Sequence, residues 1–81
     1  MPQSDTQKRK KALEAEIAFT VAAFERAEKA RAASSYTFFI EDAEYQVRVH
    51  LHQASNLDRK LGGPGFASYT QLREYLESMN E

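Results

Sequence analysis

Two histidines separated by one residue, His50 and His52, are the first candidates for chemistry in this chain. They lie in the stretch Tyr45–His52, where apolar and polar residues alternate. On a β-strand this spacing puts both imidazoles on one face, with Cα atoms about 6.5–7 Å apart, which suits two ligands of one zinc ion. The sequence does not fix a third ligand, for which Glu41 and Asp58 are candidates. We interpret the histidines as outward-facing polar residues and expect neither a metal nor a cofactor.

The same outward face is expected to carry an aromatic ring and a guanidinium group, those of Phe39 and Arg48. Such groups can stack on nucleic-acid bases, and they are also enriched in protein–protein interfaces. The chain lacks the aromatic pattern of RNA-binding sheets, and residues 35–81 hold seven Asp and Glu against four Lys and Arg. We therefore favour protein recognition over nucleic-acid binding for this face, and a packed or merely solvated sheet surface stays an open alternative.

A basic run near the N-terminus could contact phosphates. It consists of Lys8, Arg9, Lys10 and Lys11. The run supports an alternative function, a nucleic-acid-binding accessory protein that combines this run with the outer sheet face. Because no basic stripe extends the run along the chain, we interpret residues 1–10 as a solvated, frayed tail and residues 11–81 as one domain.

A glycine-rich segment, Gly62–Gly65, precedes the expected C-terminal helix and could in principle present backbone N–H groups to an anion. It has neither the Walker nor the Rossmann spacing, and Pro64 removes one donor. We interpret this segment as a connection or an exposed recognition tip.

The chain has few residues that could carry out catalysis. The chain has no cysteine and no serine in a nucleophile-elbow motif. The carboxylates of Glu41, Asp42 and Glu44 cluster in an expected turn, where water would leave them ordinary acids. We therefore expect that the protein is not an enzyme.

One long helix is expected over residues 5–33, which contain nine Ala and neither Gly nor Pro. At 100° per residue its apolar residues form two stripes, so the helix has more apolar surface than a small domain can cover. The first stripe is Leu13, Ile17, Thr20, Val21, Phe24 and Ala27. The second is Ala12, Ala15, Phe19, Ala22, Ala23 and Ala30. We expect the second stripe to bind a partner, with Phe19 as its anchor.

A β-hairpin is expected after this helix, with strands at Tyr36–Ile40 and Tyr45–His52 joined by an acidic turn. The spacing of Tyr69, Leu72, Tyr75, Leu76 and Met79 predicts a short C-terminal helix. The expected fold is a two-layer α+β domain of order α-β-β-α, with a third short strand near Phe66 as an open alternative.

These expectations define a small interaction protein. With 81 residues, 42% of them hydrophobic, the chain makes one domain; it lacks cysteine and a membrane-spanning run, so we expect a cytoplasmic location. We expect a homodimer through the long helix that regulates or inhibits a larger protein partner by covering its surface, as a phage-encoded inhibitor or a toxin antagonist would. The expected partner-binding residues are Ala15, Phe19, Ala22, Ala23, Arg26, Phe39 and Arg48.

Overall fold

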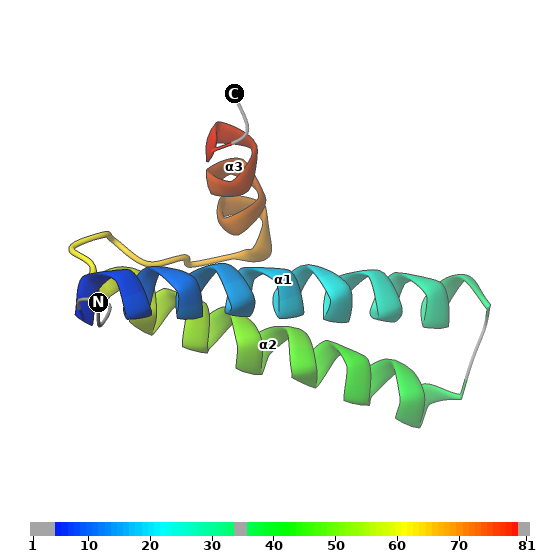
Figure 1. Cartoon of the computed structure of the whole chain (residues 1–81). Coiled ribbons are helices and arrows are strands. Elements are labelled where there is room, and N and C mark those ends of the chain that lie inside the picture. The colour runs from blue at the N-terminus through cyan, green and yellow to red at the C-terminus, as the bar shows by residue number, and fades with distance from the viewer. Residues whose placement is uncertain (1–4, 34–35, 80–81) are drawn as a thin grey trace.

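The structure is a computed structural model that describes residues 5–33 and 36–79. It contains the helices α1 (Asp5–Ala32), α2 (Thr37–Lys60) and α3 (Tyr69–Met79). Helices α1 and α2 lie antiparallel, side by side, and α3 stands across this helical hairpin (Figure 1). No strand occurs in the described residues, so the fold is all-α and the expected α+β fold with its β-hairpin is wrong.

The two segments expected to be strands, Tyr36–Ile40 and Tyr45–His52, belong almost wholly to α2, which begins at Thr37. Their alternation covers few residues, whereas a stripe at helical spacing extends over residues 40–61. Its members are Ile40, Ala43, Val47, His50, Ala54, Leu57 and Leu61. This stripe lies along α1, and packing of one continuous face is what stabilises a helix in a protein. The segment near Phe66 is likewise a loop and not a third strand.

Helix α1 contacts α2 through one face whose residues recur every three or four positions. The buried members are Leu13, Ile17, Thr20, Ala23 and Ala27. The hydroxyl of the buried Thr20 donates a hydrogen bond to the backbone carbonyl of Glu16 at 2.7 Å. Near the connection between the helices the buried residues are small, with Ala27 0% and Ala43 3% exposed. There the two helices can approach closely, and an ion pair between Arg31 and Glu44 (3.3 Å) bridges them at the surface.

The main core lies where all three helices meet. It consists of Leu13 and Ile17 from α1, Ala54 from α2, Phe66 from the loop and Leu72 from α3. Tyr69, the first residue of α3, stacks on Phe24 of α1 with ring centroids 3.9 Å apart. The loop thus runs along one side of the hairpin, over the half where α1 begins, and α3 packs there through its first turns and then rises away from the hairpin (Figure 1).

Enlarging an alanine at the contact of α1 and α2 should destabilise the protein. Leu in place of the fully buried Ala27 has no space without moving α2, so Ala27→Leu should lower the free energy of unfolding by roughly 1–3 kcal/mol. Urea denaturation followed by circular dichroism measures this. Ala18→Leu, at an exposed position of the same helix, is the matched control. Equal stability of the two variants would contradict the close helix contact.

Burial raises the pKa of Tyr69 above 10.0; Arg73 opposes this rise, and the carboxylates of Glu25 and Glu28 add to it. Tyrosinate is therefore less favourable in the folded state than in the unfolded one. The resulting stabilisation is complete below about pH 10 and is lost as the pH rises through the pKa of the folded state.

Tyr69→Phe keeps the stack on Phe24 and removes the titrating hydroxyl, so it should reduce the loss of stability at alkaline pH. Urea midpoints at about pH 8 and pH 11 measure the effect. Tyr36→Phe, at a side chain that is 81% exposed, is the control and should change nothing. The same alkaline loss in Tyr69→Phe and in the wild type would contradict the shift.

Candidate interaction surface

Five of the nine aromatic residues are exposed. Four of them, Tyr36, Phe38, Phe39 and Tyr45, lie in or next to the first turns of α2, and we call this group the aromatic end. The fifth, Phe19, lies in the middle of α1 and is 54% exposed. Large exposed apolar patches mark sites where proteins bind each other.

Three rings of the aromatic end contact one another, and none of the four belongs to the core. The rings of Phe38 and Phe39 meet edge to face at 5.7 Å, and those of Tyr36 and Phe39 lie 6.3 Å apart. The guanidinium of Arg48 lies over the Tyr45 ring at 6.0 Å. Aromatic side chains and arginine are the residues most often found at the energetic centres of protein interfaces.

Phe19 lies on the side of the hairpin away from α3. Phe19 and Phe24 are five residues apart, which is about 140° around α1, and Phe24 is the residue that Tyr69 of α3 covers. The exposed neighbours of Phe19 on α1 are small. We define the Phe19 face as this side of the hairpin, with Ala12, Ala15, Phe19, Ala22 and Arg26 from α1 and with Gln46, His50 and Gln53 from α2.

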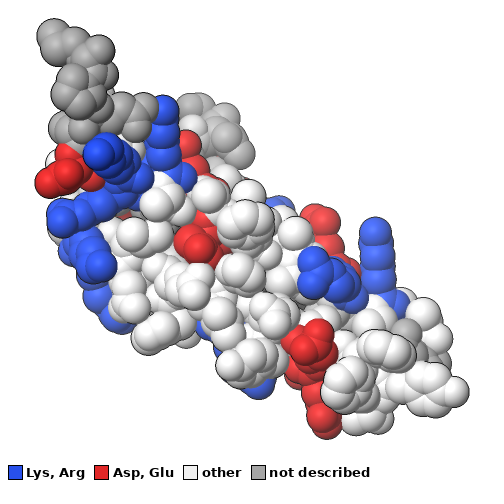
Figure 2. Space-filling model, turned by 60° about the horizontal axis from the view of Figure 1, so that its bottom comes forward, with Lys and Arg blue, Asp and Glu red and all other residues white. Residues whose placement is uncertain are grey.

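The second stripe expected on the long helix is therefore only partly covered by the protein itself. Ala23 is buried and Ala30 partly buried, whereas Ala12, Ala15, Phe19 and Ala22 are exposed. Arg26, which was expected to bind a partner beside the stripe, is also exposed. Figure 2, which brings the lower side of the hairpin forward, shows uncharged side chains over much of the middle of that side.

A small polar cluster lies next to Phe19. The His50 ring is 5.4 Å from the Phe19 ring, and its Nδ1 lies 2.8 Å from Oε2 of Glu16. With its amide nitrogen towards Glu16, Gln53 donates to both carboxylate oxygens at 3.0 Å. The carboxylate is thus held by two side chains of α2, and this cluster fixes how the two helices are aligned.

The structure separates two pairs of residues that the expected hairpin had placed together. On a helix, His50 and His52 point about 160° apart; His50 bonds Glu16, while His52 contacts Asn56 at 3.3 Å. Phe39 and Arg48 point about 180° apart on the same helix. No group of metal-binding side chains occurs in the described part of the chain.

The basic run Lys8–Lys11 lies in the first turns of α1, and all four side chains are exposed. Four consecutive residues on a helix point in different directions, so the run does not make one flat basic surface. Glu14 lies beside Lys10 and Lys11 at a shallow hollow of about 480 Å³. Of the expected tail, residues 1–4 lie outside the described residues, and residues 5–10 are helical.

The glycine-rich segment is a closed loop whose backbone donors are used internally. Asp58, 7% exposed, accepts the N–H of Gly65 at 2.9 Å through its carboxylate and that of Gly63 through its carbonyl. The hydroxyl of Ser55 accepts from the N–H of Phe66 at 2.9 Å and donates to the Phe66 carbonyl at 2.7 Å. No donor of these residues is left to bind a phosphate.

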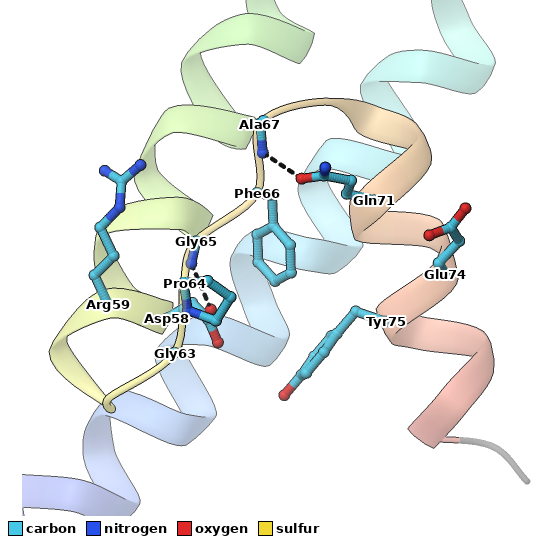
Figure 3. A pocket seen from close by; sticks show the side chains of 10 residues that line it. All are labelled: Asp58, Arg59, Gly63, Pro64, Gly65, Phe66, Ala67, Gln71, Glu74 and Tyr75. Atoms are coloured by element: carbon cyan, nitrogen blue, oxygen red, sulfur yellow. Dashed lines mark hydrogen bonds between the residues drawn. The ribbon is translucent and has the colours of Figure 1, made fainter.

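Close approach explains two of the glycines. A Cβ at Gly63 would overlap the Asp58 carboxylate, and Gly65 has a positive φ of 80° with the Arg59 side chain beside it. Together with α3 the loop borders a shallow hollow of about 560 Å³ (Figure 3). The side chain of Gln71 accepts from the Ala67 N–H there at 2.8 Å, and the Ser68 hydroxyl accepts from the Gln71 N–H at 3.3 Å.

Comparison with protein-family models, with curated proteins and with solved structures finds no match for this chain. None of the described helices is long and apolar enough to cross a membrane. The described residues thus form three helices with an exposed aromatic surface, and the role of the protein has to be inferred from that surface.

Removing the Asp58 carboxylate, which accepts a hydrogen bond from the glycine loop, should destabilise the protein. Asp58→Ala leaves the buried N–H of Gly65 without its partner and should lower the free energy of unfolding by roughly 1–3 kcal/mol. Asp58→Asn keeps an acceptor oxygen and should lose less. Urea denaturation of both variants measures the difference. Wild-type stability in Asp58→Ala would contradict the structural role of this carboxylate.

Proposed function

We propose that this chain is a small non-enzymatic protein-interaction module that regulates or inhibits a larger protein in the cytoplasm by covering part of its surface. We also propose that it self-associates through α1. The observation that carries the proposal is the aromatic end, where four exposed rings lie within residues 36–45. The fold does not need these rings, because the core lies elsewhere in the hairpin.

The arrangement of the titratable groups supports a binding role over a catalytic one. Glu41 and Asp42 are exposed, and Glu44 is paired with Arg31. The hollow beside the glycine loop has Asp58 at its wall, but that carboxylate accepts a loop N–H. The basic run does not form one surface, so we do not favour the nucleic-acid function.

The aromatic end offers a large apolar contact at low entropic cost. Aromatic side chains have few rotatable bonds, and those of Phe38 and Phe39 already contact each other. Burying one such ring against a partner contributes roughly 1.5–3 kcal/mol. Loss of both should therefore weaken partner binding by far more than tenfold.

The double variant Phe38→Ser/Phe39→Ser tests this. Wild-type and variant chains are immobilised, proteins that the wild type retains from nuclease-treated extract are identified, and the affinity of each purified partner is measured by calorimetry. We expect the wild type to bind and the variant to lose at least tenfold in affinity, with its melting temperature unchanged. Met79→Ser, which removes an exposed apolar side chain of α3, is the matched control and should bind like the wild type.

Two outcomes would contradict the proposal. Equal affinity of the double variant and the wild type would show that the aromatic end is not the binding surface. Retention that disappears on nuclease treatment, and that Lys8→Ser/Lys11→Ser also abolishes, would favour the nucleic-acid function.

A further inference from the structure

We propose that the end of the hairpin where α1 begins binds a short, extended, acidic segment of the partner protein. This inference rests on the proposed function in one respect, that the partner is a protein. It adds a second contact, far from the aromatic end, and the chemistry of the partner at that contact. We call this part of the surface the basic end, and it consists of Lys8, Arg9, Lys10, Lys11, Arg59 and Lys60.

The antiparallel hairpin brings these cations together from two distant parts of the sequence. Glu16 of α1 lies opposite His50 and Gln53 of α2, because it bonds both side chains. In antiparallel helices, each step towards the start of α1 is matched by a step towards the end of α2. The basic run of α1 therefore lies opposite the last residues of α2, which include Arg59 and Lys60. Figure 2 shows Lys and Arg gathered at this end.

The cations of the basic end are not used by the fold. All six side chains are exposed. Within residues 5–33 and 36–79 the ion pairs are those of Arg31 with Glu44 and of His50 with Glu16, so none involves the basic end. Cations in the first turns of a helix lie next to the positive end of its dipole, so the basic run lowers the stability of α1. These charges are therefore available to bind an anion.

The arrangement of the cations favours an acidic polypeptide over a nucleic acid. The side chains of the basic run point to several sides of α1, so a straight duplex could contact only some of them. A single strand is flexible, but its binding relies on bases that stack on exposed aromatic rings. The exposed rings among the described residues are Phe19 and those of the aromatic end, and none of them lies at the basic end.

The charge of the rest of the hairpin limits the length of the ligand. Residues 12–58 hold eight Asp and Glu against four Lys and Arg, so a polyanion that extended beyond the basic end would be repelled. A short acidic segment avoids this repulsion. Two adjacent helices are together about 20 Å wide, and an extended chain rises about 3.3 Å per residue. A segment of about six to eight residues can therefore reach the cations of both helices.

The experiment measures the affinity for a defined acidic peptide by fluorescence anisotropy. The probe is a fluorescein-labelled peptide of about twelve alternating Asp and Glu residues, long enough to reach both helices. We expect the wild type to bind it at about 20 mM NaCl and to lose it at about 500 mM NaCl, because salt screens exposed charges.

Two charge reversals, one on each helix, test the site. Lys8→Glu and Lys60→Glu should each weaken binding of the peptide about tenfold, because each replaces an attraction by a repulsion. Lys29→Glu, at an exposed position near the other end of α1, is the matched control and should bind like the wild type, although it changes the net charge equally. The helical circular dichroism of all three variants should be that of the wild type.

Three results would overturn the inference. The first is a wild type that does not bind the peptide at low salt. The second is equal affinity of Lys60→Glu and Lys29→Glu, which would show an effect of net charge alone. The third is tighter binding of a DNA duplex, a DNA single strand or phosphatidylserine vesicles than of the peptide, which would assign the basic end to another class of anion.

The test is independent of the aromatic end. The double variant Phe38→Ser/Phe39→Ser keeps the basic end and should bind the acidic peptide like the wild type. Loss of partner binding in that variant with wild-type peptide binding would separate the two contacts. The proposed function can therefore stand while this inference fails, and the reverse also holds.

Discussion

The constraint on which the structure depends is the difference in length between its helices. Helices α1 and α2 have 28 and 24 residues, whereas α3 has 11. At 1.5 Å per residue α3 is only about 16 Å long, and it stands across a hairpin of about 40 Å instead of lying along it (Figure 1), so most of the hairpin is not covered by α3. The large side chains of the core therefore gather where α3 lies, and the rest of the hairpin has two layers of helix with solvent on both sides.

In that uncovered part the two long helices are held together by small residues. Ala27 and Ala43 are buried between them and bring the backbones close, but alanine buries little apolar area, so this part of the hairpin gains little stability from burial. Two large apolar residues there, Phe38 and Phe39, face solvent. Two helices whose contact is lined by alanine leave no room for a phenyl ring between them, so these rings are free to contact another protein.

The long helix could be predicted from the sequence because its signals agree. It has no helix breaker, and its apolar residues repeat at a single period. Residues 36–52 contain two competing patterns. The alternation of the eight residues Tyr45–His52 led to the strand prediction, because several members of the helical stripe, such as Ala43, His50 and Ala54, are small or polar. The glycine segment was predicted as a connection, but its closed shape could not be predicted, because the bonds from Ser55 and Asp58 that close it join residues whose types do not reveal a partner.

Whether the residues of a candidate site lie together in the structure depends on whether the sequence analysis assigned them to the correct element, a helix or a strand. A wrong period changes every neighbour of a side chain, since residues two apart share a face on a strand and point almost oppositely on a helix. The pairing of His50 with His52 and of Phe39 with Arg48 was lost for this reason. Phe19 is different, because its element was assigned correctly and the angle between it and Phe24 depends only on the helical period. Its exposure could therefore be expected from the sequence, even though the helix that packs beside it could not.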